Sequence, residues 1–403
     1  SSNYYPTTPI IHLPETQFLI PGFVDTHNHA PQWTQRGVGR GIPLLEWLEK
    51  VTFAHEAKFK VVEYAKRTYK SCVNGFLKQG ITTASYYGSF HAEASKVLAD
   101  VCVELGQRAL VGKCNMDRNA PDWYSDSSAQ VSLEETRGFI EYVRQKQHDS
   151  AGGGQLVTPV ITPRFAISCT EPLLEGLGEI AKQNRDIPIQ THFNEARDEI
   201  EFTKSLFPNF KTETDLYEKY NLFTSRSILA HSIFLQEHEI QRLREVNGGI
   251  AHCPISNTTM QEFMIAPIRE YLHRGIKVGL GTDSGGGYSS SMLEVMKQAF
   301  LVSNARETIT AGKDPALSLE ECFYLATLGG AQVCGLGDKV GNFEVGKEFD
   351  ALVINTDVED GVMTPVEEED SVYVVLEKFL MTGDDRNIAK VYVNGKVVKN
   401  RLE

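Results

Sequence analysis

From residue 18 onward, short runs of β-branched and apolar residues alternate with longer stretches whose apolar residues recur at helical spacing. The short runs predict eight strands, at 18–25, 81–87, 108–116, 157–166, 187–193, 227–234, 248–254 and 276–282. The longer stretches predict helices at 92–105, 133–147, 171–184, 236–246, 266–274 and 291–306. The pattern therefore indicates a repeated strand–helix unit.

Strands that are apolar throughout and separated by helices are typical of parallel strands buried on both faces. Eight such units are the number found in a (β/α)8 TIM barrel, where catalytic groups lie at the carboxyl ends of the strands. A doubly wound open sheet is the main alternative, although it more often has a glycine-rich phosphate turn after its first strand. We therefore expect an α/β fold with a (β/α)8 barrel.

The ends of the chain differ from this repeat. Beyond Leu328 glycines become frequent, and Lys390–Val397 predicts a hairpin with Asn394-Gly395 as its turn. We expect a barrel over 18–336, with 337–403 as the C-terminal part of a small β domain and 1–17 as an incomplete N-terminal part of it. The long segment 31–74 is expected to hold a lid or extra helices.

Composition excludes several classes of partner. The 403 residues are 41% hydrophobic and 9% aromatic, which suits a folded protein with a large core. A net charge of −13 without a Lys/Arg-rich block argues against nucleic acid. No apolar run approaches eighteen residues and the N-terminus lacks a signal-peptide pattern, so no membrane partner is expected. Seven scattered cysteines without a C-x-x-C pair favour reduced thiols and a cytoplasmic location.

Metal-ligating side chains gather at the predicted strand ends. His27 and His29 end the first strand, and their i, i+2 spacing places both side chains on the same side. His192 ends the fifth strand, His231 lies in the sixth and Asp283 follows the eighth, so a barrel would bring all five to one mouth. Three histidines and an aspartate suit Zn²⁺ with one position open for water, although Fe²⁺ or Mn²⁺ would accept similar ligands.

Three polar residues near these strand ends are candidates for chemistry on a substrate. Glu195 could carry protons, work that is typically worth roughly 10²–10⁴-fold in rate; the alternative is a carboxylate favoured by a helix N-terminus. Arg164 could donate to a carbonyl or an anion, or form a surface ion pair. Gln32 could bind an amide-like edge, or be solvated in a loop.

Aromatic residues near the same mouth could stack on a flat ring, although each is more often part of a core. These are Trp33, Phe165 and Phe193. Lys113 might be taken for a catalytic amine, but a packed lysine is the favoured interpretation. His91-Ala92-Glu93 matches H-x-E of a zinc deaminase site, yet the required P-C-x-x-C is absent.

Several stretches carry a resemblance to a known family. PGFVDTHNHA, THFNE, ILAHS, AHCPISN and GLGTDSGGGYS resemble the barrel motifs of the amidohydrolase superfamily. The longer stretches PLLEWLEK, GQRALVGKCNMD, TPRFAISC, LATLGGAQ, GNFEVGKEFDALVIN and MTGDDRNIAKVYVNGK are similar to the guanine deaminases within it. The resemblance covers nearly all of the chain from residue 18.

This resemblance implies a (β/α)8 barrel with one Zn²⁺ and a small β-sandwich domain built from both chain ends. By position, the metal ligands would be His27, His29, His192 and Asp283. His231 would lie beside the metal-bound water, Glu195 would be the proton shuttle, and the substrate contacts would be Gln32, Arg164 and Phe165, to which the aromatic pattern adds Trp33. Family members usually carry several strands before PGFVDTH, whereas only about twenty residues precede it here.

The function implied is zinc-dependent hydrolysis of guanine to xanthine and ammonia in purine catabolism or salvage, by a homodimer. Water would lose its proton through Glu195 and Asp283. One alternative is a deaminase of another aminopurine, a pterin or a triazine in the same superfamily. A second alternative is a non-catalytic barrel scaffold, but such proteins typically lose metal ligands that are present here.

Overall fold

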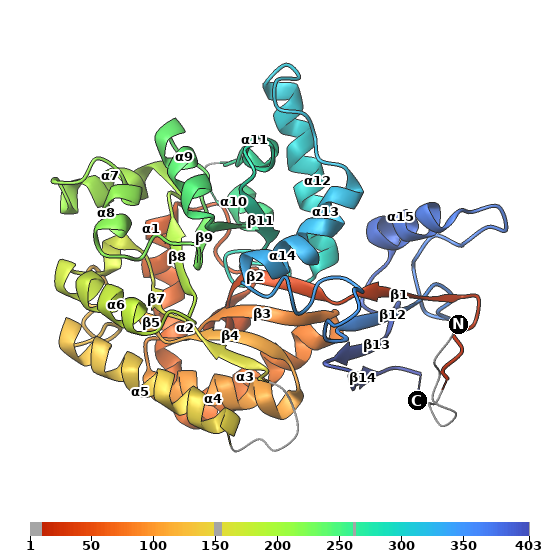
Figure 1. Cartoon of the computed structure of the whole chain (residues 1–403), viewed down its shortest axis with the longest axis horizontal. Coiled ribbons are helices and arrows are strands. Elements are labelled where there is room, and N and C mark those ends of the chain that lie inside the picture. Colours follow the sequence, from red (N-terminus) through yellow and green to blue (C-terminus); the bar gives the residue numbers. More distant parts are fainter. Residues whose placement is uncertain (1–9, 149–154, 261–262, 403) are drawn as a thin grey trace.

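Two parallel sheets form the centre of the protein in the computed structural model, which describes residues 10–148, 155–260 and 263–402 (Figure 1). Their strand orders are β2-β3-β4-β6 and β11-β10-β9-β8. Helices surround these strands, and a separate antiparallel sheet, β1-β12-β13-β14, lies to one side near both ends of the described chain (Figure 1). The predicted α/β class with parallel sheets is confirmed.

The central parallel strands occur where the apolar runs predict them, with shifted ends. They are β2 (Phe23–His29), β3 (Ile81–Tyr87), β4 (Arg108–Gly112), β6 (Val157–Pro159), β8 (Ile189–Phe193), β9 (Ser227–His231), β10 (Gly249–His252) and β11 (Lys277–Leu280). The predicted strands 108–116 and 157–166 each break in two, because the short pair β5 (Cys114–Asn115) and β7 (Thr162–Pro163) follows β4 and β6.

The two parallel sheets touch at both outer edges. Ile161, just after β6, forms a parallel bridge with Ile189 of β8. On the opposite side, Thr26 Oγ1 donates to the carbonyl of Leu280 at 2.9 Å, and the backbone N–H of Asp283 donates to the carbonyl of His27 at 2.8 Å. These bonds hold the carboxyl end of β2 directly beside that of β11.

The single strand predicted at 18–25 is wrong, because the run contains parts of two strands. β1 (Gln17–Pro21) pairs antiparallel with β12, and β2 begins at Phe23. Gly22 lies between them, where a Cβ would overlap the side chain of Thr82. The apolar residues of β1 continue into Phe23 and Val24 at the start of β2, so the hydrophobic pattern alone did not reveal the change of sheet.

The small sheet contains β12 (Ala351–Asn355), β13 (Ile388–Val393) and β14 (Lys396–Asn400) together with β1. The predicted hairpin is confirmed: Asn394 and Gly395 have φ of 47° and 72°, as the turn between β13 and β14 requires. Helix α15 (Val372–Thr382) was not predicted. The buried Arg108 of β4 links the parallel sheets to the small sheet through Asp350, with guanidinium–carboxylate distances of 3.0 and 3.1 Å.

Helices cover the parallel sheets and fill the long segment after β2, as expected. The predicted helix 92–105 coincides with α4, and the others differ by a few residues. The segment 31–74 holds 3-10, α and π turns before α3. The α-helices are α1 (Leu44–Trp47), α2 (Phe53–Glu56), α3 (Val62–Lys78), α4 (Ala92–Leu105), α5 (Ala129–His148), α6 (Glu171–Gln183), α7 (Arg197–Leu206), α8 (Glu213–Lys219), α9 (Glu237–Val246), α10 (Pro254–Thr259), α11 (Ile268–His273), α12 (Met292–Ile309), α13 (Leu319–Leu325) and α14 (Leu328–Val333), with α15 between β12 and β13 in the chain.

Within the described ranges, no helix combines the length and apolar character needed to cross a bilayer. All seven cysteines are free thiols, and all are buried.

Candidate active site

Three buried side chains and the partly buried His192 meet where β2, β8 and β11 end. His29 Nε2 lies 3.0 Å from His192 Nε2, and Asp283 Oδ1 lies 3.3 Å from His27 Nε2 and 3.6 Å from His29 Nε2. The i, i+2 spacing in β2 turns both of its histidines toward the same point. The structure thus brings together His27, His29, His192 and Asp283, the set predicted to bind a metal.

The hydrogen bonds of the histidines leave lone pairs facing this point. His192 Nδ1 lies 2.6 Å from the backbone carbonyl of Arg164. A carbonyl only accepts, so Nδ1 carries the proton and Nε2 presents its lone pair. His231 Nδ1 is likewise engaged, 2.8 Å from Asn257 Oδ1. The Nε2 atoms of His27 and His231 are buried without a hydrogen-bond partner.

These atoms fit a metal ion. Buried polar atoms normally have partners, so unpaired ring nitrogens around one point call for a cation. The donor atoms of His27, His29 and His192 all lie within 4.8 Å of one another. Imidazole nitrogens and a carboxylate are the donors that Zn²⁺ and similar divalent metals take. The described residues therefore provide a ligand set suited to such an ion.

Burial governs the charge of the site. It lowers the pKa of His29 and His192 well below the usual histidine value, and neighbouring histidines add to the effect, which favours the neutral, ligating form of the rings. Burial by itself would raise the pKa of Asp283, but contact with His27 and the other histidines holds it well below its usual value. Burial, with the charge of Asp283, raises the pKa of Glu195 to about 8.

Glu195 lies in the turn that follows β8. Its Oε1 is 3.5 Å from His231 Nε2, and His231 Nε2 is 4.0 Å from Asp283 Oδ2. Asn194, His231 and Asp283 have φ of 46°, 69° and 42°, a left-handed backbone that is unfavourable for residues other than glycine. This backbone aims Glu195, His231 and Asp283 toward the ligand histidines.

Asp25 fixes the end of β11 against β2. It accepts hydrogen bonds from the backbone N–H of Thr282 at 2.9 Å, from Thr282 Oγ1 at 2.6 Å and from Asn28 Nδ2 at 3.1 Å. Asp25 is fully buried. It therefore holds Asp283, the next residue after Thr282, at the carboxyl ends of the strands.

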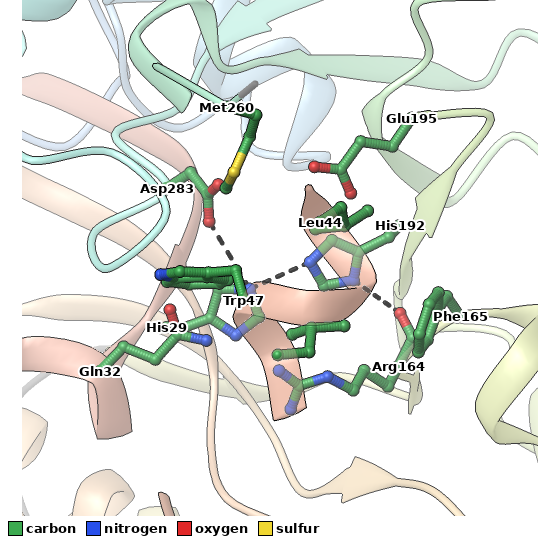
Figure 2. Close-up of a pocket in the computed structure, with 11 residues that line it drawn as sticks. His29, Gln32, Leu44, Trp47, Arg164, Phe165, His192, Glu195, Met260 and Asp283 are labelled. Carbon is green, nitrogen blue, oxygen red and sulfur yellow. Dashed lines mark hydrogen bonds and ion pairs between the residues drawn. The ribbon is translucent and has the colours of Figure 1, made fainter. Parts of the chain in front are cut away.

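A cavity opens beside these residues. In Figure 2, Gln32 and Arg164 lie below His29 and His192, while Glu195 lies above them. The lining residues are His29, Gln32, Leu44, Trp47, Leu48, Arg164, Phe165, His192, Glu195, Met260 and Asp283. Apolar walls with a few converging polar groups suit a flat, polar-edged ring.

Trp33 is not among the residues that line this cavity. Its Nε1 donates to Ser71 Oγ at 3.1 Å, and its ring packs 5.5 Å from Phe76, centre to centre, against α3. Trp47, from the same long segment, lines the cavity in its place. Phe193 also lies outside it, buried among Tyr217 and Phe223.

Lys113, which might be taken for a catalytic amine from the sequence, is buried in an ion pair with Asp126 and donates to Ser132 Oγ at 3.1 Å. This is the packed lysine that the sequence favoured.

Comparison with known proteins decides the family, because the amidohydrolase family profile matches residues 18–398. The chain belongs to the amidohydrolase family. It is 45% identical over 386 residues to a probable guanine deaminase of Schizosaccharomyces pombe, covering 96% of this chain and 72% of that protein. It is 44% identical to guanine deaminase of Mus musculus, covering 96% and 84%. The sequence resemblance to guanine deaminases is confirmed.

Solved amidohydrolase structures agree. The structure of guanine deaminase from C. acetobutylicum with bound guanine has a TM-score of 0.90 to this chain at 36% identity, covering 99% of this chain and 91% of that one. The guanine deaminase of E. coli has a TM-score of 0.85 at 33% identity, covering 96% and 84%.

Sequence reasoning missed several residues of this amidohydrolase site. Glu56 of α2 is buried behind the cavity, where it pairs with Arg164 at 2.8 Å and accepts from Gln32 Nε2 at 2.8 Å. Trp47 and Met260 line the cavity. None of the three comes directly after a predicted strand, so position at a strand end could not reveal them. The one available signal was the pair of tryptophans in segment 31–74, one of which is Trp47.

Proposed function

We propose that this chain hydrolyses guanine to xanthine and ammonia. The observation that carries the proposal is the joint presence of a complete set of metal-ligating side chains and a small cavity beside it, in a chain 41–45% identical to guanine deaminases of several eukaryotes. The neighbouring structure with guanine in its active site supports the same substrate.

In this proposal Zn²⁺ is held by His27, His29, His192 and Asp283. His27 Nε2 is buried without a hydrogen-bond partner, which favours a cation. The proton on His192 Nδ1 keeps the lone pair of Nε2 free for it. When bound, the ion supplies Lewis-acid activation of the attacking water.

Glu195 carries the proton. The water oxygen forms a bond to the carbon that bears the exocyclic amine, while Glu195, assisted by Asp283, takes a proton from the water and delivers it to a ring nitrogen. The amine takes the proton that remains on the added hydroxyl, the carbon–nitrogen bond breaks, and ammonia leaves as that oxygen becomes a new carbonyl of xanthine. His231, 3.5 Å from Glu195 and 4.0 Å from Asp283, holds the reacting oxygen between these carboxylates.

The far end of the cavity selects the ring. Arg164 donates to the purine carbonyl, Gln32 contacts another edge, and Phe165 contacts a face of the ring. Adenine has an amine in place of this carbonyl, so it would leave the Arg164 donors unpaired, and such mismatches reject a substrate strongly.

We also propose that the two parallel sheets form a closed (β/α)8 barrel, which begins at β2 and not at residue 18, because β1 belongs to the small sheet. Support comes from the contacts at both sheet edges. The β-sandwich domain remains a prediction, as do the homodimer and the cytoplasmic location. Exposed apolar side chains of α15, Val372 and Tyr373, suit a subunit contact.

A substrate panel tests the proposal. Purified protein is assayed for ammonia release from guanine, adenine, a pterin and an aminotriazine at equal concentrations. We expect guanine to give the highest kcat/KM, with adenine lower by a factor of about 10⁴. A higher kcat/KM on a pterin or triazine would assign the chain to another deaminase of the family, and no turnover of any of them would support the scaffold alternative.

A further inference from the structure

Glu56 is a buried carboxylate that the mechanism above does not use, and its side chain lies behind Arg164 and Gln32, which line the cavity. It ends α2 and is 1% exposed. Arg164 donates to it from both terminal nitrogens, at 2.8 Å to Oε2 and 3.2 Å to Oε1. Gln32 Nε2 donates to Oε1 at 2.8 Å, and the hydroxyl of Tyr124 donates to Oε2. Every one of these donors comes from a different part of the chain.

The two-point bond to Arg164 sets both orientation and charge. A bidentate pair fixes the plane of the guanidinium, and Arg164 is one of the residues that line the cavity. Burial by itself would lower the pKa of Arg164, but Glu56 raises it, so the arginine stays charged while the pair as a whole is neutral. An arginine without this partner would place an uncompensated cation in a buried wall.

The bond to Gln32 sets the direction of the amide. Because Nε2 donates to Glu56, Oε1 is turned away from the carboxylate, and it is buried without a hydrogen-bond partner. Gly285 lies against this oxygen, and a Cβ there would overlap it. The cavity wall therefore presents fixed donors from Arg164 beside a fixed acceptor from Gln32.

We propose that Glu56 is a positioning and charge-neutralising residue that makes this end of the cavity select an uncharged ring with an acceptor and a donor on adjoining edges. The inference rests on the proposed guanine deamination and deepens it. Guanine, whose carbonyl adjoins a ring N–H, is such a ring. Xanthine is more acidic than guanine and ionises near neutral pH, so a neutral wall does not retain the product anion.

The discriminating experiment measures binding rather than turnover. Calorimetry gives the Kd of xanthine and of hypoxanthine, which has the same carbonyl but resists ionisation, in slightly acidic and slightly alkaline buffer. For the wild-type enzyme we expect the affinity for xanthine, relative to hypoxanthine, to fall as xanthine ionises. A wild-type enzyme that binds the xanthine anion more tightly than the neutral form would overturn the proposal, and this result needs no variant to fold.

Variants separate charge from shape. In Glu56→Gln, which leaves Arg164 as an unpaired cation, the xanthine anion should bind about tenfold or more tightly relative to hypoxanthine than in wild type, and KM for guanine should rise about tenfold. The double variant Glu56→Gln/Arg164→Gln, which restores neutrality, should lose the anion preference without regaining guanine turnover. Tyr124→Phe removes one hydrogen bond and keeps the charge, so the xanthine-to-hypoxanthine ratio should stay at its wild-type value.

The outcomes distinguish this inference from the function on which it rests. An unchanged ratio in a folded Glu56→Gln, or an equal change in Tyr124→Phe, would reduce Glu56 to a structural residue while guanine turnover by wild type stands. Wild-type protein that neither binds these purines nor deaminates guanine would overturn the proposed function itself.

Discussion

Replacing Glu195 with glutamine tests the proton transfer in the proposed reaction. The amide has the size of the carboxylate but does not take up a proton at neutral pH. Glu195 is 3% exposed, its Oε1 lies 3.5 Å from His231 Nε2, and its backbone N–H is held by Glu199 at 3.1 Å. Glutamine should therefore occupy the same position, and the change should remove chemistry rather than structure.

The expected loss follows from the role. Acid–base catalysis by one positioned group is typically worth about 10²–10⁴-fold, which corresponds to about 3–5 kcal/mol of activation free energy. We expect kcat for guanine to fall by that factor in Glu195→Gln, with metal content equal to that of wild type.

Steady-state ammonia release and metal analysis of the same preparation measure both quantities. Glu179→Gln on the outer face of α6, where the side chain is 51% exposed, is the matched control and should keep kcat within about twofold of wild type. A Glu195→Gln enzyme with near-normal kcat would refute the assigned role, and loss of the metal together with activity would make Glu195 a ligand instead.

Two further variants change Gly285, beside the cavity, and Glu199, in the first turn of α7. Gly285 has φ of 117° and a Cβ there would overlap Gln32 Oε1, so Gly285→Ala should raise KM for guanine about tenfold or more. The control is Gly138→Ala on the open face of α5. It should leave KM unchanged and raise the free energy of unfolding by about 0.5–1 kcal/mol. Burial and the charge of Glu213 raise the pKa of Glu199 well above its usual 4.5, so the folded protein binds a proton that the unfolded chain releases as pH rises. Stability should therefore fall with rising pH above that value, by up to about 1.4 kcal/mol per unit, and Glu199→Gln should remove this slope in urea unfolding at about pH 5 and about pH 8; identical slopes in both proteins would contradict it.

The sequence was most informative where chemistry coincides with periodic structure. His27 and His29 follow an apolar strand at the spacing that puts both on one side, and His192 and Asp283 end later strands of the same sheet system. Parallel topology brings such ends together whatever their separation in sequence. This is why residues up to 256 positions apart could be assigned to one cluster from the sequence alone.

The sequence was least informative where the chain leaves that periodicity. Glu56 and Trp47 lie in the long segment after β2, whose short 3-10, α and π turns have no repeating pattern to show which face is buried. Trp33 was chosen from this segment because it is near His29, but tertiary packing sends its ring against Phe76. The run at 18–25 hid a change of sheet, because its apolar residues continue from β1 into the first two residues of β2.

The proposed deamination of guanine at this site depends on a bound metal. Its most direct test is ammonia release from guanine by purified protein, measured before chelation, after chelation and after Zn²⁺ is added back. We predict turnover that is lost on chelation and recovered with Zn²⁺, with xanthine formed in equal amount to ammonia. Full guanine turnover by protein shown to be free of metal, or no turnover by protein with the metal bound, would contradict metal-dependent deamination at this site.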